Sequence, residues 1–550
     1  MIAAVPAGAR RASIPQTIVS SVTTDADGEV ARAALSFPAT HAAFSWTGDE
    51  DTGVRYRTIN AEGRATPWRA APEAQDMEHG RHHYSGVISL DRPEVIEWIA
   101  VRPSTARVGT VTLDYLNTVD GPRVSLARSP DSETRHTPEI VTRAQWGADE
   151  SIKRDTGDCT RAFYRVQQLF VHHTAGSNYD SHPEATMRAI YWYHTVRRGW
   201  CDIGYNFVIG WDGRIYEGRW ARRYRPWEAH TNEDRRGRAV RGAHVKEFNS
   251  GSVGVSLMGN FSTVPVPARM RRALRQFLAW EADRHNLPPQ GTHIYRNPET
   301  GLRRKLPFIA GHLHAGQTAC PGGNVYRRLP SIRRAVLRTI GAGRFNTRVR
   351  LQSPTQEIPY GSATRVRGRL ARRSGAGMPG REIAVYTRAG LAPWRRASVV
   401  TGTDGRFSAR LAPAANAAAV AVWRGGSRSW GSQSVTRRIA VQPHVSLVAE
   451  GVEAGADGVY RYPAGTTEVT LAGEVRPPHP GRPVRVEIAE VPSDGGAITR
   501  GVPLAPDSRY SYTFTRPQAG ATYRAATRIA EHRDHAPGTS PSIAFTIEEP

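Results

Sequence analysis

Two histidines and a cysteine in the middle of the chain have the residue types of a metal site. His172 follows an apolar run, residues 169–171, that indicates a strand. His312 stands eight residues before Cys320. Zinc accepts imidazole nitrogen and thiolate sulfur, and a catalytic zinc site uses three protein ligands and leaves one position open. These side chains could supply that set, but their spacing alone leaves open that each histidine is an ordinary, satisfied polar residue.

The chain contains three cysteines, Cys159, Cys201 and Cys320. Because three is an odd number, at least one of them lies outside any intramolecular disulfide. The economical interpretation pairs Cys159 with Cys201 in an oxidising compartment and leaves Cys320 as a thiolate ligand.

The candidate ligands lie in a segment, residues 138–343, in which helical and strand patterns alternate. Ser181 could cap the first helix, and Pro183 suits its first turn. The mixture predicts a central α/β domain, a mixed sheet with flanking helices. The spacing of apolar residues predicts, in chain order, a strand at 169–171, a helix at 183–198, strands at 205–209 and 253–257, and a helix at 267–285.

On the N-terminal side of this segment the apolar residues alternate with polar ones, as in β-strands. Residues 26–128 are therefore predicted to form a β-sandwich domain. The charged and polar residues 129–137 indicate a linker, and the polar, irregular residues 1–25 are expected to be a disordered N-terminal segment.

On the C-terminal side the β patterning returns as a repeat. Gly368 and Gly473 belong to two similar stretches and lie 105 residues apart (473 − 368). A unit of about 100 residues is the size of an immunoglobulin-like sandwich. We therefore predict two C-terminal immunoglobulin-like β-sandwiches, residues 344–442 and 443–550, neither of which shows an obvious catalytic cluster.

Length and charge restrict the class of protein. A chain of 550 residues predicts three to five domains. The net charge of +24 favours polyanionic partners, but the basic residues are dispersed along the chain, which argues against nucleic acid. No apolar stretch approaches the ~20 residues of a membrane span, so we expect no integral membrane segment. The small residues among positions 1–10 could be the tail of a signal peptide whose start lies upstream.

Six motifs of the central segment occur together and in order. They are TRAQWGA at 142–148, FVHHTA at 170–175, GWCDIGYNF at 199–207, GWDGRIYEGR at 210–219, GAH at 242–244 with FN at 248–249 and SVGV at 252–255, and HLHAGQTACPG at 312–322. This segment, roughly 200 residues, resembles the peptidoglycan recognition protein and type-2 N-acetylmuramoyl-L-alanine amidase family. The resemblance implies a zinc-dependent hydrolase of the amide between muramic acid and the L-alanine of the stem peptide.

The resemblance also implies roles for individual residues. His172, His312 and Cys320 match the three zinc ligands of the family. Tyr205 matches the tyrosine that assists catalysis. Thr318 stands where family members carry Lys, Thr or His near the scissile carbonyl; a threonine there can donate a hydroxyl hydrogen bond but cannot act as a cation.

Three further residues fall where the family binds substrate. His244 and Asn249 match positions along the groove, so we expect them to contact peptidoglycan. His173 is predicted to contact substrate as well, although it could instead support the ligand strand. Sequence does not name the partner that fixes the tautomer of each ligand histidine.

Two alternatives to an enzyme stay open. Some family members bind peptidoglycan without cutting it, typically after losing the cysteine ligand, whereas Cys320 is present here. The flanking β-domains would also suit a structural or adhesive wall protein. With the predicted disulfide, the resemblance favours a secreted or cell-wall-associated bacterial protein.

Overall fold

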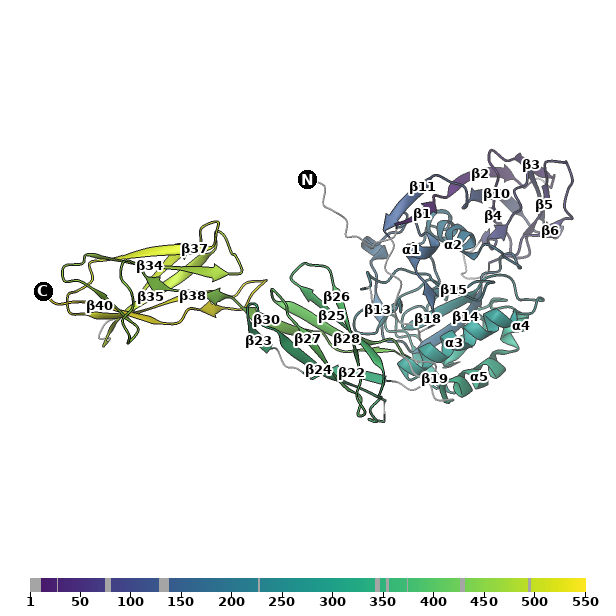
Figure 1. The fold of residues 1–550 in the computed structure, drawn as a ribbon. Coiled ribbons are helices and arrows are strands. Elements are labelled where there is room, and N and C mark those ends of the chain that lie inside the picture. Colours follow the sequence, from purple (N-terminus) through teal and green to yellow (C-terminus); the bar gives the residue numbers. More distant parts are fainter. Residues whose placement is uncertain are drawn as a thin grey trace. The chain divides into compact units, whose positions relative to one another are not determined.

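The computed structural model describes residues 11–26, 28–74, 81–127, 138–225, 228–341, 347–352, 356–372, 374–425, 431–492 and 496–550 (Figure 1). It divides into two compact units, the first reaching residue 346 and including 424–431, the second formed by 347–423 and 432–550. The predicted signal-peptide tail and the predicted linker lie outside the described residues. Among those described, no helix is both long and apolar enough to cross a membrane.

A five-stranded and a four-stranded sheet form most of the N-terminal region, and their inner faces contribute to one apolar cluster that includes Phe44 and Trp98. The first sheet has the order β2 (Ile18–Asp25), β10 (Val108–Asn117), β4 (His41–Gly48), β7 (His82–Tyr84), with β8 (Ile88–Ser89) also on β4. The second has the order β3 (Ala31–Ala34), β9 (Val95–Val101), β5 (Gly53–Ile59), β6 (Arg69–Ala70).

The expectation that residues 1–25 are disordered is wrong for positions 11–25. These residues form β1 (Arg11–Pro15), which pairs with β11 (Arg123–Ala127), and β2, which pairs along its whole length with β10. The polar side chains of β2 occupy the exposed face of an edge strand, and a polar sequence gives little sign of such pairing.

A six-stranded mixed sheet lies at the centre of the first unit, as predicted. Its order is β12 (Ile140–Val141), β16 (Ile215–Glu217), β15 (Phe207–Ile209), β18 (Ser252–Leu257), β14 (Gln168–His173), β21 (Ile309–Gly311). All neighbours are parallel except β15 and β16. Every residue of β14 is buried, because strands pair with it on both sides and helices cover the sheet. Two small ribbons pair β13 (Phe163–Tyr164) with β17 (Ala239–Val240) and β19 (Thr292–Arg296) with β20 (Arg303–Pro307).

The two predicted helices are confirmed, with two changes to the first. The helices are α1 (Arg143–Trp146), α2 (Pro183–Trp192), α3 (Ala268–His285), α4 (Gly323–Tyr326) and α5 (Leu329–Gly341), with short 3₁₀ turns at Gly157–Cys159 and His312–His314. The helix predicted to end at residue 198 continues past α2 as a π-helical turn, η2 (Tyr193–Arg197). Its N-cap is His182, not Ser181, and Pro183 occupies the first turn. Helix α3 packs against β14, β15 and α5.

The N-terminal and central regions share a core. The apolar cluster of the central sheet includes Ala43 and Val87 from the N-terminal region. The Tyr193 hydroxyl of η2 donates to the Phe44 carbonyl at 3.1 Å, and Arg197 pairs with the buried Asp114. The two regions therefore bury apolar surface against each other and pack as one body.

Two similar β-domains form the second unit. In the first, one sheet has the order β22 (Thr347–Leu351), β24 (Thr364–Arg372), β27 (Arg406–Leu411), and the other β23 (Gln356–Pro359), β30 (Arg437–Gln442), β28 (Ala417–Trp423), β25 (Glu382–Ala389), β26 (Arg395–Val400), with β29 (Ser432–Gln433) on β28. In the second domain, one sheet is centred on β34 (Glu468–Arg476), which pairs with β31 (His444–Val445), β32 (Val448–Ala449) and β37 (Arg509–Thr515). The other sheet has the order β33 (Val459–Tyr462), β40 (Ile543–Ile547), β38 (Thr522–Ile529), β35 (Pro483–Val491), β36 (Ile498–Pro503), with β39 (Gly538–Thr539) on β38.

The two larger sheets repeat the same strand order, which agrees with the predicted repeat. The matching glycines occupy the same place, Gly368 on β24 and Gly473 on β34. A Cβ on Gly368 would lie 2.6 Å from the Arg350 carbonyl oxygen, and a Cβ on Gly473 would lie 2.0 Å from the Ser446 carbonyl oxygen. Both positions therefore exclude a side chain. The immunoglobulin-like assignment and the division into domains at residues 128, 138, 343 and 443 stay predictions.

Candidate functional site

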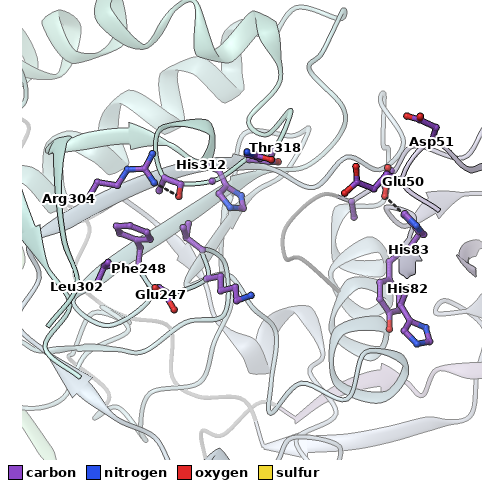
Figure 2. A pocket seen from close by; sticks show the side chains of 18 of the residues that line it. Glu50, Asp51, His82, His83, Glu247, Phe248, Leu302, Arg304, His312 and Thr318 are labelled. Atoms are coloured by element: carbon purple, nitrogen blue, oxygen red, sulfur yellow. Dashed lines mark hydrogen bonds and ion pairs between the residues drawn. The ribbon is translucent and has the colours of Figure 1, made fainter. Parts of the chain in front are cut away.

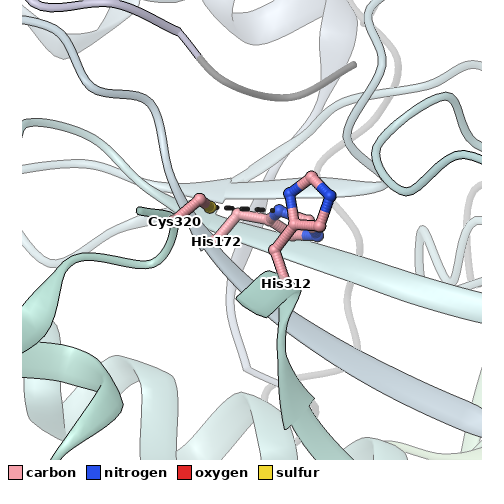
Figure 3. Close-up of side chains that lie close together, drawn as sticks. All are labelled: His172, His312 and Cys320. Atoms are coloured by element: carbon pink, nitrogen blue, oxygen red, sulfur yellow. Dashed lines mark hydrogen bonds between the residues drawn. The ribbon is translucent and has the colours of Figure 1, made fainter. Parts of the chain in front are cut away.

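The ends of two parallel strands bring His172 and His312 together. His172 lies near the carboxyl end of β14, and His312 directly follows β21, which pairs with β14. Parallel neighbours end at the same edge of a sheet, so the two side chains meet there. Cys320 comes from the loop before α4. One donor atom from each of the three residues lies within 4.8 Å of the other two (Figure 3).

This donor set fits zinc. The Cys320 Sγ lies 3.4 Å from His172 Nδ1, and ligands of one tetrahedral zinc ion are about 3.5 Å apart. All three side chains are buried. Burial, reinforced by the nearby His312 and His244, holds the pKa of His172 well below its usual value, so its imidazole is neutral and can bind a cation.

The structure gives His244, expected from sequence to contact substrate, a contact with His172. His244 is fully buried behind His172, and its Nδ1 lies 3.1 Å from His172 Nε2. A metal ion on the Nδ1 that faces the sulfur would leave the proton on Nε2 of His172, which would then donate to His244. Burial lowers the pKa of His244 to about 3, so it stays a neutral acceptor at pH 7. His244 is therefore the partner that fixes the tautomer of a ligand histidine.

Two glycines make room for this partner. A Cβ on Gly254 in β18 would lie 2.5 Å from the His244 ring, and one on Gly242 would lie 2.6 Å from it. Sequence reasoning missed this role, yet a signal was present. An isolated glycine between valines in a strand often marks a close approach by another group.

His173 and Asn249 also have structural partners. His173 points to the face of β14 opposite His172, as neighbours in a strand do, and its Nδ1 accepts the Phe261 backbone N–H at 3.1 Å. Asn249 Oδ1 accepts the backbone N–H groups of His244 and Val245, and so fixes the loop that carries His244. These bonds favour support over the predicted substrate contact.

Tyr205 and Thr318 flank the three donors. The ring centroid of Tyr205 lies 5.6 Å from that of His172. The Thr318 hydroxyl oxygen accepts the backbone N–H of Cys320 at 3.1 Å, which leaves its own proton available to donate. The sulfur of Cys320 also accepts the backbone N–H of His173 at 3.4 Å.

A groove of about 1040 Å³ opens onto His312 and Thr318. Figure 2 shows its two walls: Phe248 and Arg304 of the central region lie on the same side as these two residues, and Glu50, Asp51 and His83 of the N-terminal region lie opposite. Glu73 holds His83 by a 2.8 Å contact to its Nδ1. The N-terminal region therefore supplies one wall of the groove, which sequence reasoning did not predict.

Comparison with known proteins gives this region a family. The family model described as N-acetylmuramoyl-L-alanine amidase matches residues 162–323. Peptidoglycan-recognition protein SC2 of Drosophila simulans is 32% identical over 193 residues, 34% of this chain and 84% of that protein. The chain belongs to the peptidoglycan recognition protein and N-acetylmuramoyl-L-alanine amidase family. Peptidoglycan recognition protein 1 of Bos taurus is 33% identical over 192 residues, 34% of this chain and 80% of that protein.

The N-terminal region, outside the matched residues, clamps the loop that follows the first ligand strand of this amidase-family domain. A Cβ on Gly86 would lie 2.5 Å from the Ala175 carbonyl oxygen, and one on Gly176 would lie 2.3 Å from that of Val87. The Ser177 hydroxyl accepts the backbone N–H of Ser89 at 2.9 Å. The two backbones approach so closely that only glycine fits, which fixes the loop beyond His173.

A disulfide and a buried ion pair anchor the segment that leads to Tyr205 in the amidase-family domain. Cys159 and Cys201 form the disulfide, the pairing that the sequence indicated, with Cα atoms 5.2 Å apart. Next to it, the buried Arg143 donates to Asp202 Oδ1 at 3.0 Å. These covalent and ionic contacts hold the segment 199–205 against the sheet edge.

Proposed function

We propose that the chain is a zinc-dependent N-acetylmuramoyl-L-alanine amidase that hydrolyses the amide between muramic acid and the L-alanine of the peptidoglycan stem peptide. One observation carries the proposal: two imidazoles and a cysteine sulfur converge within the residues that match the amidase family, and one of them, His312, lines a large groove. The presence of Cys320 favours hydrolysis over recognition alone.

The surrounding residues prepare this site for chemistry. When bound by His172, His312 and Cys320, zinc would lower the pKa of water and polarise the scissile carbonyl. His244 would accept a hydrogen bond from the Nε2–H group of His172 and so keep the Nδ1 of His172 directed at the site. The Thr318 hydroxyl is placed to donate to the oxygen on which charge develops. Tyr205 packs beside His172, where its hydroxyl could bond water or substrate.

The groove supports a polymeric substrate such as peptidoglycan. Its central wall carries the cations Arg304 and Lys246, which suit the carboxylates of stem peptides, and its opposite wall carries Glu50 and Asp51, which suit amino groups. The disulfide between Cys159 and Cys201 supports a protein exported to an oxidising compartment, at or near the cell wall.

The test incubates the purified full-length chain with peptidoglycan and follows new L-alanine amino termini and zinc content. We expect wild type to release stem peptides, and Cys320→Ser to bind the wall without releasing them. If wild type binds but liberates no amino termini, the protein is a recognition protein. If Cys320→Ser releases peptides at the wild-type rate, zinc hydrolysis at this site is wrong.

A further inference from the structure

A second cluster of histidine and carboxylate side chains lies in the C-terminal β-domain. His479 belongs to the turn between β34 and β35, and Asp534 and His535 to the loop between β38 and β39. One donor atom of each residue lies within 4.8 Å of the other two. The two histidines are 5% and 1% exposed, so they lie inside the domain.

The hydrogen bonds of His535 leave a lone pair inside this cluster. Its Nδ1 lies 2.7 Å from the Ala536 carbonyl oxygen, which can only accept, so Nδ1 carries the proton. Nε2 is then a bare acceptor, and it is buried without a hydrogen-bond partner among the described residues. A backbone carbonyl on the far nitrogen is the usual support of a metal-ligating histidine.

His479 lies beside this lone pair. Its Nδ1 is buried and makes no hydrogen bond of good geometry in the described part of the chain, with the backbone carbonyl of Pro477 as a nearby acceptor. Its Nε2 lies 3.8 Å from Asp534 Oδ2, which is too long for a hydrogen bond. The two imidazole rings meet edge to face, with centroids 4.2 Å apart. The bare Nε2 of His535, buried beside a second imidazole and a carboxylate, is unfavourable unless something binds it.

We propose that His479, Asp534 and His535 form a second metal site that binds a divalent transition-metal cation, with Zn²⁺ the best match to two imidazoles and a carboxylate. Ligands of a tetrahedral zinc ion are about 3.4 Å apart, so binding would draw the three donors together by about an ångström. His532 holds the other carboxylate oxygen of Asp534 and orients it.

The surroundings of this site indicate what the metal does. The Asp534 carbonyl accepts the backbone N–H of Asn416 at 2.7 Å, and the backbone N–H of Ala536 donates to Val441 at 2.8 Å. Asn416 and Val441 belong to the preceding β-domain. The ligand loop therefore connects the two C-terminal domains, and a bound cation would stiffen their junction.

A third cluster in the central region shows the contrast. Glu233, Glu281 and His285 also lie close together, but the guanidinium of Arg284 pairs with both carboxylates. A cation of the chain itself pairs with the carboxylates there, whereas no ion pair between Asp534 and an arginine or lysine is found among the described residues.

The experiment measures zinc bound per full-length chain after chelation, reloading with Zn²⁺ and dialysis. We expect His172→Ala/Cys320→Ser to retain one zinc ion, and the same variant with His479→Gln and His535→Gln to retain none. His444→Gln, an exposed histidine of the same domain, is the matched control and should change nothing. A zinc-free His172→Ala/Cys320→Ser protein would overturn the proposal.

A second measurement covers the case in which the quadruple variant misfolds. Hydrogen exchange of metal-free wild type is followed with and without Zn²⁺ alone. We expect slower exchange of the amides of Asn416 and Ala536 with Zn²⁺ if the junction site binds it. Unchanged exchange at both amides would contradict the proposal and indicate that water alone satisfies the two nitrogens.

Discussion

Two histidine clusters in this chain use similar ligands in different settings. His172 and His312 lie at the ends of parallel strands, Cys320 lies in the loop before α4, and His312 lines a groove of about 1040 Å³. His479 and His535 lie on turns at a domain junction, with a carboxylate in place of the thiolate. The comparison teaches that the surroundings of the open coordination position, more than the ligands, separate a catalytic site from a structural one.

Another buried histidine sharpens the contrast. His41, at the contact between the N-terminal and central regions, has a partner on each nitrogen: Thr186 Oγ1 lies 2.9 Å from Nε2, and Thr40 Oγ1 lies 3.0 Å from Nδ1. A histidine satisfied in this way holds the fold together. The buried nitrogens of His479 and His535 are what mark that pair as candidate ligands.

The largest expected difference is in catalysis. Cys320→Ser should lower kcat/KM for stem-peptide release by about a thousandfold, because the metal supplies several kcal/mol of transition-state stabilisation. His535→Gln should leave kcat/KM near the wild-type value. Initial rates on soluble peptidoglycan fragments measure both. An equal loss of kcat/KM in the two variants would contradict the distinction between a catalytic and a structural cluster.

The next effect concerns the partner of His172. His244→Ala leaves the Nε2 proton of His172 without its acceptor, and we expect a 10–100-fold loss of zinc affinity or activity, the usual cost of removing such a partner. Zinc titration and initial rates give the two values. His182→Ala, an exposed histidine on the same domain, is the control, and a matching loss there would show that the effect is not specific.

The next effect concerns the stability that His41, a histidine with hydrogen-bond partners on both nitrogens, contributes to the fold. Burial, then the charge of Arg188, lowers its pKa to about 3. As the pH falls through 6.5, His41 of the unfolded chain binds a proton that His41 of the folded chain does not bind. The contribution of neutral His41 to the free energy of unfolding is therefore complete above pH 6.5 and is lost as the pH falls. From pH 7 to pH 5 the loss is about 2 kcal/mol.

Denaturant unfolding at the two pH values measures it. His41→Gln should remove about this much of the pH dependence, with or without Zn²⁺. A pH dependence identical in wild type and His41→Gln would contradict the assignment of this histidine as a neutral structural group.

The smallest expected effect concerns the wall opposite the catalytic donors. Glu50→Gln/Asp51→Asn removes exposed charges that line the groove without touching the three donors. Exposed ion pairs contribute at most about 1 kcal/mol, so we expect KM to rise by up to about fivefold with kcat unchanged. Glu62→Gln, exposed in a turn of the same region, is the control. A fall in kcat alone would place the wall in catalysis instead of binding.

Sequence predicted the catalytic cluster better than its surroundings. The order of six motifs was enough to select His172 from the 172/173 pair, and the structure brings it together with His312 and Cys320. The place of His244 depends on the space left by Gly242 and Gly254, which a motif match does not express.

Other features depend on tertiary packing between segments distant in sequence. The wall that carries Glu50 and Asp51 faces the groove only because β4 and η2 pack together, and no local pattern encodes that contact. His479 and His535 are 56 positions apart (535 − 479) in two unrelated turns. Their meeting requires that β34 and β38 lie in facing sheets of one sandwich, so neither turn alone indicates a ligand.

The core shared by the N-terminal and central regions limits how recombination can separate these two regions of the gene. Ala43 and Val87 belong to the same apolar cluster as the sheet that carries His172. A recombination event near residue 138 that moved the amidase-family segment into another gene would expose this surface to water and remove a wall of the groove. The two regions should therefore be inherited together as one unit.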